Sequence, residues 1–245
     1  MNGRTALVTG GSRGIGAATA LRLARAGADV AITYVTDREA AEDVIRKVEA
    51  AGRRGVALRA DSGDAAEVAD AVPRAADALG GGRLDVLVNN AGVGVVGPLE
   101  ELTAADVDRV LAVNVRGVFL ASRAAAARMG PGGRIVTIGS CLAQRVPGPG
   151  ATLYTMSKSA LVGLTRALAR ELGGRCITAN IVHPGPVDTG MNPADGPLAD
   201  GQRAVTALGR FGVADEVASL VAYLAGDDAA YVTGAEFAVD GGHAA

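Results

Sequence analysis

The feature that most constrains this fold is a regular alternation of short apolar runs with longer alanine-rich amphipathic segments. The runs have the length and β-branched content of strands, and the segments between them follow helical periodicity. Strands are predicted at Thr5–Thr9, Val30–Tyr34, Val56–Ala60, Val86–Asn89, Ile135–Ile138, Ile177–Val182 and Glu236–Val239. Helices are predicted at Gly14–Ala26, Arg38–Ala51, Ala65–Leu79, Ala104–Arg128, Thr152–Leu172 and Ala214–Ala225.

Strands and helices that alternate at this spacing are typical of parallel βαβ units. Several strands are continuously apolar, which indicates a sheet covered on both faces. The pattern predicts a single α/β domain over residues 1–245, a Rossmann-type doubly wound parallel sheet of about seven strands with helices on both faces. Residues 185–212 are dense in Gly, Pro, Asp and Asn, with a weak helical interval near Ala199–Ala207. They follow the sixth strand and are predicted to form a substrate-side loop.

Composition argues against several classes of partner. The formal net charge is −2 and only 3% of residues are aromatic, so neither a basic nor a base-stacking surface for nucleic acid is expected. No uninterrupted run of about twenty apolar residues predicts a membrane-spanning helix. Cys141 and Cys176 are interpreted as reduced core thiols of a cytoplasmic protein. His183 and His243 lie too far apart in sequence to suggest a metal site.

A glycine-rich turn joins the first strand to the first helix. It reads Thr9-Gly10-Gly11-Ser12-Arg13-Gly14-Ile15-Gly16. Glycines at 10, 14 and 16 let the backbone turn sharply and approach a pyrophosphate without clashes from Cβ atoms. The N-terminus of the helix offers N–H groups and the positive end of its dipole to that anion. The turn therefore predicts a dinucleotide site.

Tyr154 and Lys158 are spaced to project from one face of a helix. A phenol with a pKa of about 10 is a poor acid or base at neutral pH, and a neighbouring ammonium lowers that pKa. A proton donor adjusted in this way is what the reduction of a carbonyl group requires. The pair predicts general acid–base chemistry.

Further motifs follow in order along the chain. They are Asn89-Asn90-Ala91-Gly92, Asn114, Ser140 and Pro184-Gly185-Pro186-Val187-Asp188-Thr189. With the glycine turn and the Tyr-x-x-x-Lys pair, they make the chain resemble the short-chain dehydrogenase/reductase family over essentially its whole length. Within that family it is similar to 3-oxoacyl carrier-protein reductases and related ketoreductases.

The resemblance implies a role for each matching residue. Tyr154 is the acid–base, Lys158 assists it and holds the nicotinamide ribose, Ser140 orients the substrate oxygen, and Asn114 supports a proton relay. Ser140 lies fourteen positions before Tyr154, about one more than in many relatives. Cofactor-binding candidates are Gly10, Ser12, Arg13, Gly14, Ile15, Gly16, Tyr34, Asp61, Ser62, Asn90, Ala91, Gly92, Tyr154, Lys158, Pro184, Gly185, Val187 and Thr189. Substrate-binding candidates are Ser140, Leu142, Gln144, Leu153, Tyr154 and Met191.

The residue at the end of the second strand predicts whether NAD(H) or NADP(H) is bound. Tyr34 stands where the resemblance places the acid that binds the ribose of NAD. Arg13, assisted by Arg38, could instead bind a 2′-phosphate. Asp37 is the competing acid, although its position suits a helix cap better. NADP(H) is therefore predicted in preference to NAD(H).

The predicted function is hydride transfer between NADP(H) and a small ketone or secondary alcohol, free or carrier-bound. Cys141, beside Ser140, invites a thiol-nucleophile hypothesis, but no His base is supplied in sequence near it. The alternative is a non-catalytic dinucleotide-binding sensor or scaffold; members of that kind typically lose the Tyr or the Lys, and this chain has both. Resemblance also implies a homotetramer. No metal, nucleic acid or membrane partner is expected.

Overall fold

The computed structural model describes all 245 residues, and its seven strands form one parallel sheet in the order β3-β2-β1-β4-β5-β6-β7. Residues that alternate along β1 enter opposite cores: Ala6 and Val8 pack on one face of the sheet and Leu7 on the other. This two-sided burial explains the continuous apolar runs. The strands are β1 (Thr5–Val8), β2 (Asp29–Tyr34), β3 (Gly55–Arg59), β4 (Val86–Asn89), β5 (Arg134–Ile138), β6 (Thr178–Pro184) and β7 (Glu236–Val239).

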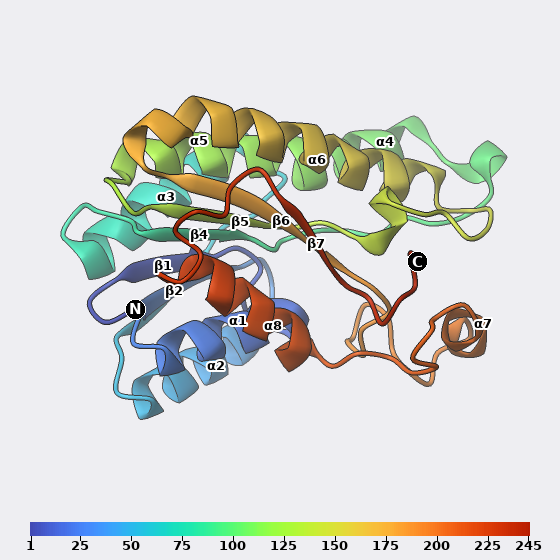
Figure 1. Ribbon diagram of the computed structural model, residues 1–245, viewed down its shortest axis with the longest axis horizontal. Helices are drawn as coiled ribbons and strands as arrows, with labels where there is room; N and C mark the ends of the chain where they lie inside the picture. The colour runs from blue at the N-terminus through green and yellow to red at the C-terminus, as the bar shows by residue number, and fades with distance from the viewer.

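Helices cover both faces of the sheet (Figure 1). One layer consists of α1 (Gly14–Arg25), α2 (Arg38–Ala50) and α8 (Ala214–Ala225). The other consists of α3 (Ala65–Gly80), α4 (Ala104–Leu111), α5 (Val118–Arg128) and α6 (Thr152–Leu172). The short α7 (Ala199–Ala204) stands apart, in the segment that follows β6. Single 3-10 turns lie at Leu99–Glu101, Cys141–Ala143 and Gly173–Arg175. The predicted fold class is confirmed.

The strand order places a switch point between β1 and β4. From β1 the chain builds outward to β2 and β3, and then returns to pair β4 on the other side of β1. Helices leave the two neighbouring strands in opposite directions there, which opens a crevice at their carboxyl ends. The glycine turn follows β1 and Asn90 follows β4, so both border this crevice.

The long helix predicted at Ala104–Arg128 is interrupted in its middle. Residues Ala112–Gly117 form a π-helical turn between α4 and α5, with Asn114 inside it. A Cβ on Gly117 would lie 2.3 Å from the carbonyl oxygen of Ser62, so the loop after β3 packs directly on this turn. A π turn holds one residue more than an α turn and redirects the side chains around it, and such turns occur often at functional sites.

This interrupted helix also bears on the predicted absence of a membrane span. By length and composition, Ala104–Arg128 could cross a membrane, because its mean hydropathy over an 18-residue window is 1.4. The sequence criterion of an uninterrupted apolar run missed it, since the average tolerates scattered polar residues. In the fold, 44% of that window is buried, and α5 packs against α3 and β4. It belongs to a helical layer on the sheet.

One of the two predicted core thiols is not in the core. Cys141 is buried, as expected, but Cys176 is exposed. Cys176 ends the turn after α6 with a left-handed φ of 56°. Cys176 lies just before the predicted strand Ile177–Val182, in a connecting turn, and such turns run over the surface.

Candidate active site

The glycine turn has the conformation that its sequence predicts. Gly10 and Gly14 adopt φ values of +63° and +54°, which L-residues with side chains rarely adopt. A Cβ on Gly16 would lie 2.4 Å from the carbonyl oxygen of Gly10, so only glycine lets α1 begin this close to the strand end. No side chain caps the N-terminus of α1. Its N–H groups are thus left for an anion, and the residues present fit a pyrophosphate.

Thr9 and Asn90 join the two strand ends that border the crevice. The Asn90 Nδ2 donates to the carbonyl oxygens of Thr9 at 2.9 Å and Gly10 at 3.0 Å. In return, the Thr9 hydroxyl accepts the N–H groups of Asn90 and Ala91, each at 3.0 Å. These four bonds fix the glycine turn against β4. Thr9 was missed by sequence reasoning, although a hydroxyl residue directly before the turn was a visible signal.

Tyr154 and Lys158 lie near the start of α6, and the helix brings them together as predicted. The Lys158 Nζ is 5.8 Å from the centroid of the Tyr154 ring and donates to the carbonyl oxygen of Ile138 at 2.9 Å. Only 4% of Lys158 is exposed. The ammonium is therefore held between α6 and the end of β5.

Burial favours the neutral form of both groups and shifts their pKa values in opposite directions. It raises the pKa of Tyr154, while a hydrogen bond with the Ser140 hydroxyl, which favours the phenolate, acts in the opposite direction. It lowers the pKa of Lys158 to about 8. The sequence led us to expect that Lys158 would lower the pKa of Tyr154. Instead, desolvation of the phenolate outweighs the neighbouring groups, and the phenol remains protonated at neutral pH, ready to act as an acid.

Asn114 is fully buried and touches two segments of the site. Its Oδ1 accepts the N–H of Val93 at 2.9 Å, and its Nδ2 donates to the Val93 carbonyl oxygen at 2.9 Å and to the Ser157 Oγ at 3.0 Å. Ser157 in turn donates to the carbonyl oxygen of Tyr154 at 2.7 Å. A Cβ on Gly92 would lie 3.4 Å from both the Asn114 Oδ1 and the Lys158 Nζ. The π turn thus places Asn114 against α6, and Ser157 is a link that sequence reasoning missed.

Ser140 stands directly after β5 and faces Tyr154. Its hydroxyl accepts the N–H of Leu142 at 3.2 Å and acts to lower the pKa of the Tyr154 phenol. The fourteen-residue interval therefore leaves Ser140 near enough to Tyr154 to influence its pKa. Neighbouring Cys141 is buried, which raises the pKa of its thiol to about 11. A protonated thiol is a weak nucleophile, so the structure agrees with rejecting it as a catalytic group.

Comparison with known proteins assigns the family. A family model described as Enoyl-(Acyl carrier protein) reductase matches residues 10–244. A solved structure of a short chain dehydrogenase from Burkholderia cenocepacia J2315, in complex with NADP, is 55% identical with a TM-score of 0.98, and the match covers 100% of this chain and 99% of that chain. The Cyclic-di-GMP-binding biofilm dispersal mediator protein of Escherichia coli (strain K12) is 45% identical over 98% of this chain and 96% of its own length. L-rhamnose 1-dehydrogenase (NAD(P)(+)) of Sphingomonas sp. (strain SKA58) is 38% identical, covering 99% and 96%.

The chain is a short-chain dehydrogenase/reductase. It is accordingly an oxidoreductase of the kind that acts on CH–OH and C=O groups with a nicotinamide cofactor. In this short-chain dehydrogenase/reductase, Asn114, Ser140, Tyr154 and Lys158 meet beside the crevice that the glycine turn borders.

The acids near the adenosine side of the crevice are engaged in local structure. Asp37 accepts the N–H of Ala40 at 2.9 Å and caps α2, as predicted. Asp61 accepts the N–H of Gly63 at 2.8 Å in the turn after β3. Tyr34, at the end of β2, is half-buried. No carboxylate therefore stands at the end of β2.

The two candidate arginines differ in their surroundings. Arg13 is exposed and forms no ion pair. Arg38 pairs with Glu42 at 2.6 Å, one turn further along α2. Arg13, inside the glycine turn, is the guanidinium available to an anion.

The segment after β6 folds back over the glycine turn. The Thr189 Cγ2 would be 3.4 Å from a Cβ on Gly14, and Val187 forms a parallel bridge with Gly212. Gly185 is packed so tightly that its Cβ would lie 2.5 Å from the Cα of Asp240. The segment predicted to meet the nicotinamide thus lies beside the segment predicted to meet the phosphates.

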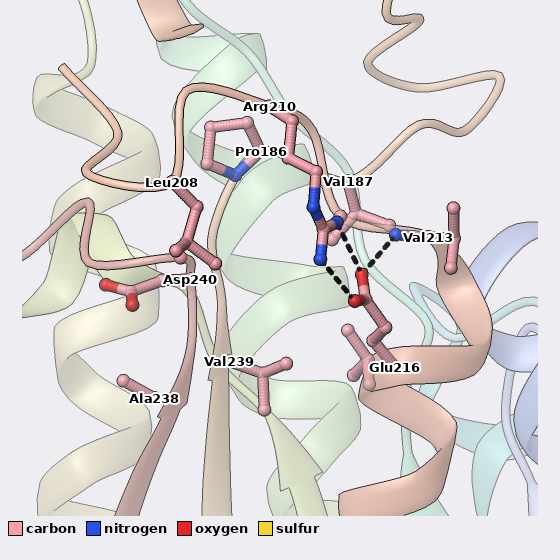
Figure 2. Close-up of a pocket in the computed structure, with 12 residues that line it drawn as sticks. Pro186, Val187, Leu208, Arg210, Val213, Glu216, Ala238, Val239 and Asp240 are labelled. Carbon is pink, nitrogen blue, oxygen red and sulfur yellow. Dashed lines mark hydrogen bonds and ion pairs between the residues drawn. The ribbon is translucent and has the colours of Figure 1, made fainter.

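A cavity of about 220 Å³ is lined in part by this segment, through Pro186 and Val187, and lies between the start of α8 and the end of β7 (Figure 2). In it the Arg210 guanidinium pairs with the Glu216 carboxylate at 2.7 Å and 3.0 Å (Figure 2). This pairing and the N–H of Val213 lower the pKa of Glu216 to about 2. The charges are mutually satisfied, and none of the four catalytic candidates lines the cavity.

The predicted substrate-side residues lie at different depths. Leu142 is half-buried and Gln144 is exposed, both just after Ser140, and Met191 is 63% exposed in the segment after β6. Leu153 is only 3% exposed, so it could form the floor of a pocket but not its entrance. The N–H of Gly97 donates to the Gly150 carbonyl oxygen at 2.8 Å and joins two of the loops on this side.

Proposed function

We propose that the chain is an NADPH-dependent ketoreductase that also oxidises the corresponding secondary alcohol. The observation that carries this proposal is the meeting of a protonated Tyr154, the Ser140 hydroxyl and the Lys158 ammonium beside an anion-binding glycine turn. A carbonyl oxygen that gains charge during reduction needs a hydrogen-bond donor and a proton donor at this spot.

NADP(H) is the proposed cofactor. The glycine turn and the start of α1 hold the pyrophosphate, and Arg13 binds the 2′-phosphate, because no carboxylate at the end of β2 repels it. Pro184, Gly185, Val187 and Thr189 hold the nicotinamide end. The related short chain dehydrogenase from Burkholderia cenocepacia, named as a complex with NADP, supports this choice.

The bound nicotinamide supplies or accepts the hydride, and the protein residues manage the proton. Ser140 orients the substrate oxygen by a hydrogen bond, and Tyr154 donates its phenolic proton to that oxygen. Lys158 stabilises the phenolate that remains. Asn114, through Ser157 and the backbone of Val93, holds the start of α6 in place and supports resupply of the proton.

The substrate is a small ketone with apolar substituents, free or carrier-bound, because the loops that surround the site carry mainly small or apolar side chains. The proposed location is the cytoplasm. Purified protein should consume NADPH, followed by absorbance, with at least one member of a panel of aliphatic, aromatic and 3-oxoacyl ketones. Intact NADPH binding with no turnover across the panel would refute the enzyme proposal.

Replacing Arg13 with Ala should weaken NADPH binding and leave NADH binding almost unchanged. Loss of a charged hydrogen bond to the 2′-phosphate should raise the Kd for NADPH about tenfold to a hundredfold. Arg25→Ala is the matched control, since it removes the same charge from the other end of α1, about 18 Å away. Fluorescence titration with both nucleotides measures the effect. Tighter binding of NADH by the unaltered protein would contradict the NADP(H) assignment.

A non-catalytic sensor of cyclic dinucleotides is the second candidate function. The 45%-identical protein of Escherichia coli is named as cyclic-di-GMP-binding, and a glycine turn beside an exposed arginine can receive the phosphates of other nucleotides. Both Tyr154 and Lys158 are present, however, which favours catalysis. Titration with cyclic di-GMP in the presence and absence of NADPH separates the two. A sensor should bind it with micromolar affinity or better and show no ketone turnover.

Assembly as a homotetramer is also proposed. Phe119 on α5 and Met156 on α6 are about half exposed, which suits a helical face covered by a second copy. Light scattering after gel filtration should give about four times the chain mass of 24.4 kDa. Phe119→Glu should shift the protein to smaller species, whereas Arg22→Glu, on the exposed surface of α1, should not. A monomer at micromolar concentration would contradict the proposal.

A further inference from the structure

His183 is a buried imidazole that the proposed mechanism does not use. It lies in β6, one residue before Pro184, and is 0% exposed. An imidazole in a strand core is costly unless both ring nitrogens find partners. The contacts of its two nitrogens lead in opposite directions, one toward the catalytic residues and the other toward the surface.

The inner nitrogen contacts the backbone of Ser140. The His183 Nδ1 is 2.9 Å from the Ser140 carbonyl oxygen and 3.2 Å from the Ser140 nitrogen. β5 ends at Ile138, and Gly139 makes the last bond to the neighbouring strand, from its N–H to the Val182 oxygen at 2.7 Å. Ser140 is therefore the first residue beyond the sheet, and the imidazole is the partner of its N–H.

The outer nitrogen contacts an acid. The His183 Nε2 is 3.2 Å from the Glu236 Oε2, and the Glu236 Oε1 pairs with Arg166 at 2.6 Å. A carboxylate accepts and does not donate, so it selects the ring forms that carry a proton on Nε2. In each of these forms Nδ1 holds the Ser140 backbone, by accepting its N–H or by donating to its carbonyl oxygen.

The ring also fits closely against the backbone that carries Ser140. A Cβ on Gly139 would lie 2.5 Å from the His183 Nδ1 and 2.8 Å from its Cε1. No side chain fits between ring and strand at this point. Small movements of the imidazole must then be transmitted to Gly139 and Ser140, because close-packed groups cannot yield independently.

We propose that His183 is a positioning residue for Ser140, with Glu236 selecting the ring form that holds it. This inference rests on the proposed ketoreductase function. By holding the Ser140 backbone at the end of β5, His183 places the hydroxyl against Tyr154 and the substrate oxygen. Catalytic hydrogen bonds lose much of their effect when a donor moves by even a fraction of an ångström.

Three substitutions at His183 test the proposal. Asn keeps a polar atom where Nδ1 stands, Gln keeps one near Nε2, and Phe keeps only the ring. His183→Asn should retain kcat within about threefold, while His183→Gln and His183→Phe should lower kcat about tenfold or more, with KM for NADPH unchanged. Circular dichroism and NADPH titration verify the fold of each variant. Equal activity of the Asn and Gln variants would overturn the assignment.

A double-mutant cycle with Ser140→Ala separates positioning from general stability. If His183 acts through Ser140, His183→Phe should cause no further loss of kcat in the Ser140→Ala background. The same tenfold loss in both backgrounds would show a role independent of Ser140 and refute the proposal. Should His183→Phe fail to fold, Glu236→Leu replaces it, with a smaller loss that must also vanish in Ser140→Ala. Absence of turnover in the unaltered protein would instead refute the ketoreductase function.

Discussion

Replacing Tyr154 with Phe is expected to lower kcat for ketone reduction by about two to four orders of magnitude. The substitution removes only the hydroxyl, which is the acid that faces Ser140 and whose pKa burial keeps high. The ring stays, so the packing of α6 should not change. Single-turnover measurements with saturating NADPH and ketone give the rate of the hydride step directly.

Binding provides the control for this variant. The Kd for NADPH should remain within a few-fold of that of the unaltered protein, because the glycine turn and Arg13 are untouched. Tyr223→Phe, on α8 and 44% exposed, removes a phenolic hydroxyl far along the chain and should keep full activity. Equal rates for Tyr154→Phe and the unaltered protein would exclude Tyr154 as the proton donor.

Replacing Lys158 with Met is expected to abolish activity and stabilise the fold at neutral pH. Burial lowers the pKa of Lys158 from 10.5 to about 8. At neutral pH the buried amine is still protonated, so its desolvated charge destabilises the native state. That difference corresponds to about 3 kcal/mol of unfolding free energy. Loss of the hydrogen bond to the Ile138 carbonyl oxygen destabilises the variant by about 1 kcal/mol. Met fills similar space, which leaves a net gain of about 2 kcal/mol.

The gain should depend on pH in a defined direction. Below about pH 8 the amine is protonated in both states, and the full cost is present in the unaltered protein. Between about pH 8 and about pH 10.5 the unfolded chain binds the proton and the native chain does not, so the stability contributed by Lys158 rises with pH. The advantage of Lys158→Met should therefore shrink across this window.

Urea denaturation of both proteins at about pH 7 and about pH 10 measures this difference at one protein concentration. Lys158→Arg is a useful companion, because it keeps the charge but cannot release it, and it should be less stable than the unaltered protein at both pH values. If Lys158→Met were more stable by the same free energy at both pH values, the lowered pKa assigned to Lys158 would be contradicted.

Much of the fold could be predicted from the alternation of strands and helices. The apolar runs identified all seven strands to within two residues at each end, and β1 shows why: Ala6, Leu7 and Val8 are buried on alternate faces of the sheet, so all three are apolar. The glycine turn was equally readable. Gly10 and Gly14 need left-handed backbone, and Gly16 needs the space, which restricts these positions to one residue type.

Contacts between distant segments could not be predicted in the same way. The helical pattern at Ala104–Arg128 gave no sign of the π turn, because that turn forms where Asn114 finds its partners in Val93 and Ser157, which belong to other segments. The direction of the Tyr154 pKa shift was also misjudged, since the desolvation of a phenol depends on how completely the surrounding segments bury it.

The sequence by itself predicted which groups carry the proposed chemistry. The Tyr154–Lys158 spacing and the glycine turn act within a few residues, so local geometry alone gives them meaning. Only the tertiary structure decided how those groups are held. His183 meets Ser140 across forty-three residues and Glu236 across fifty-three, and such pairings exist only once parallel strands have aligned. Local motifs follow from residue type and spacing, whereas the burial of a side chain and its hydrogen-bond partners follow from the fold.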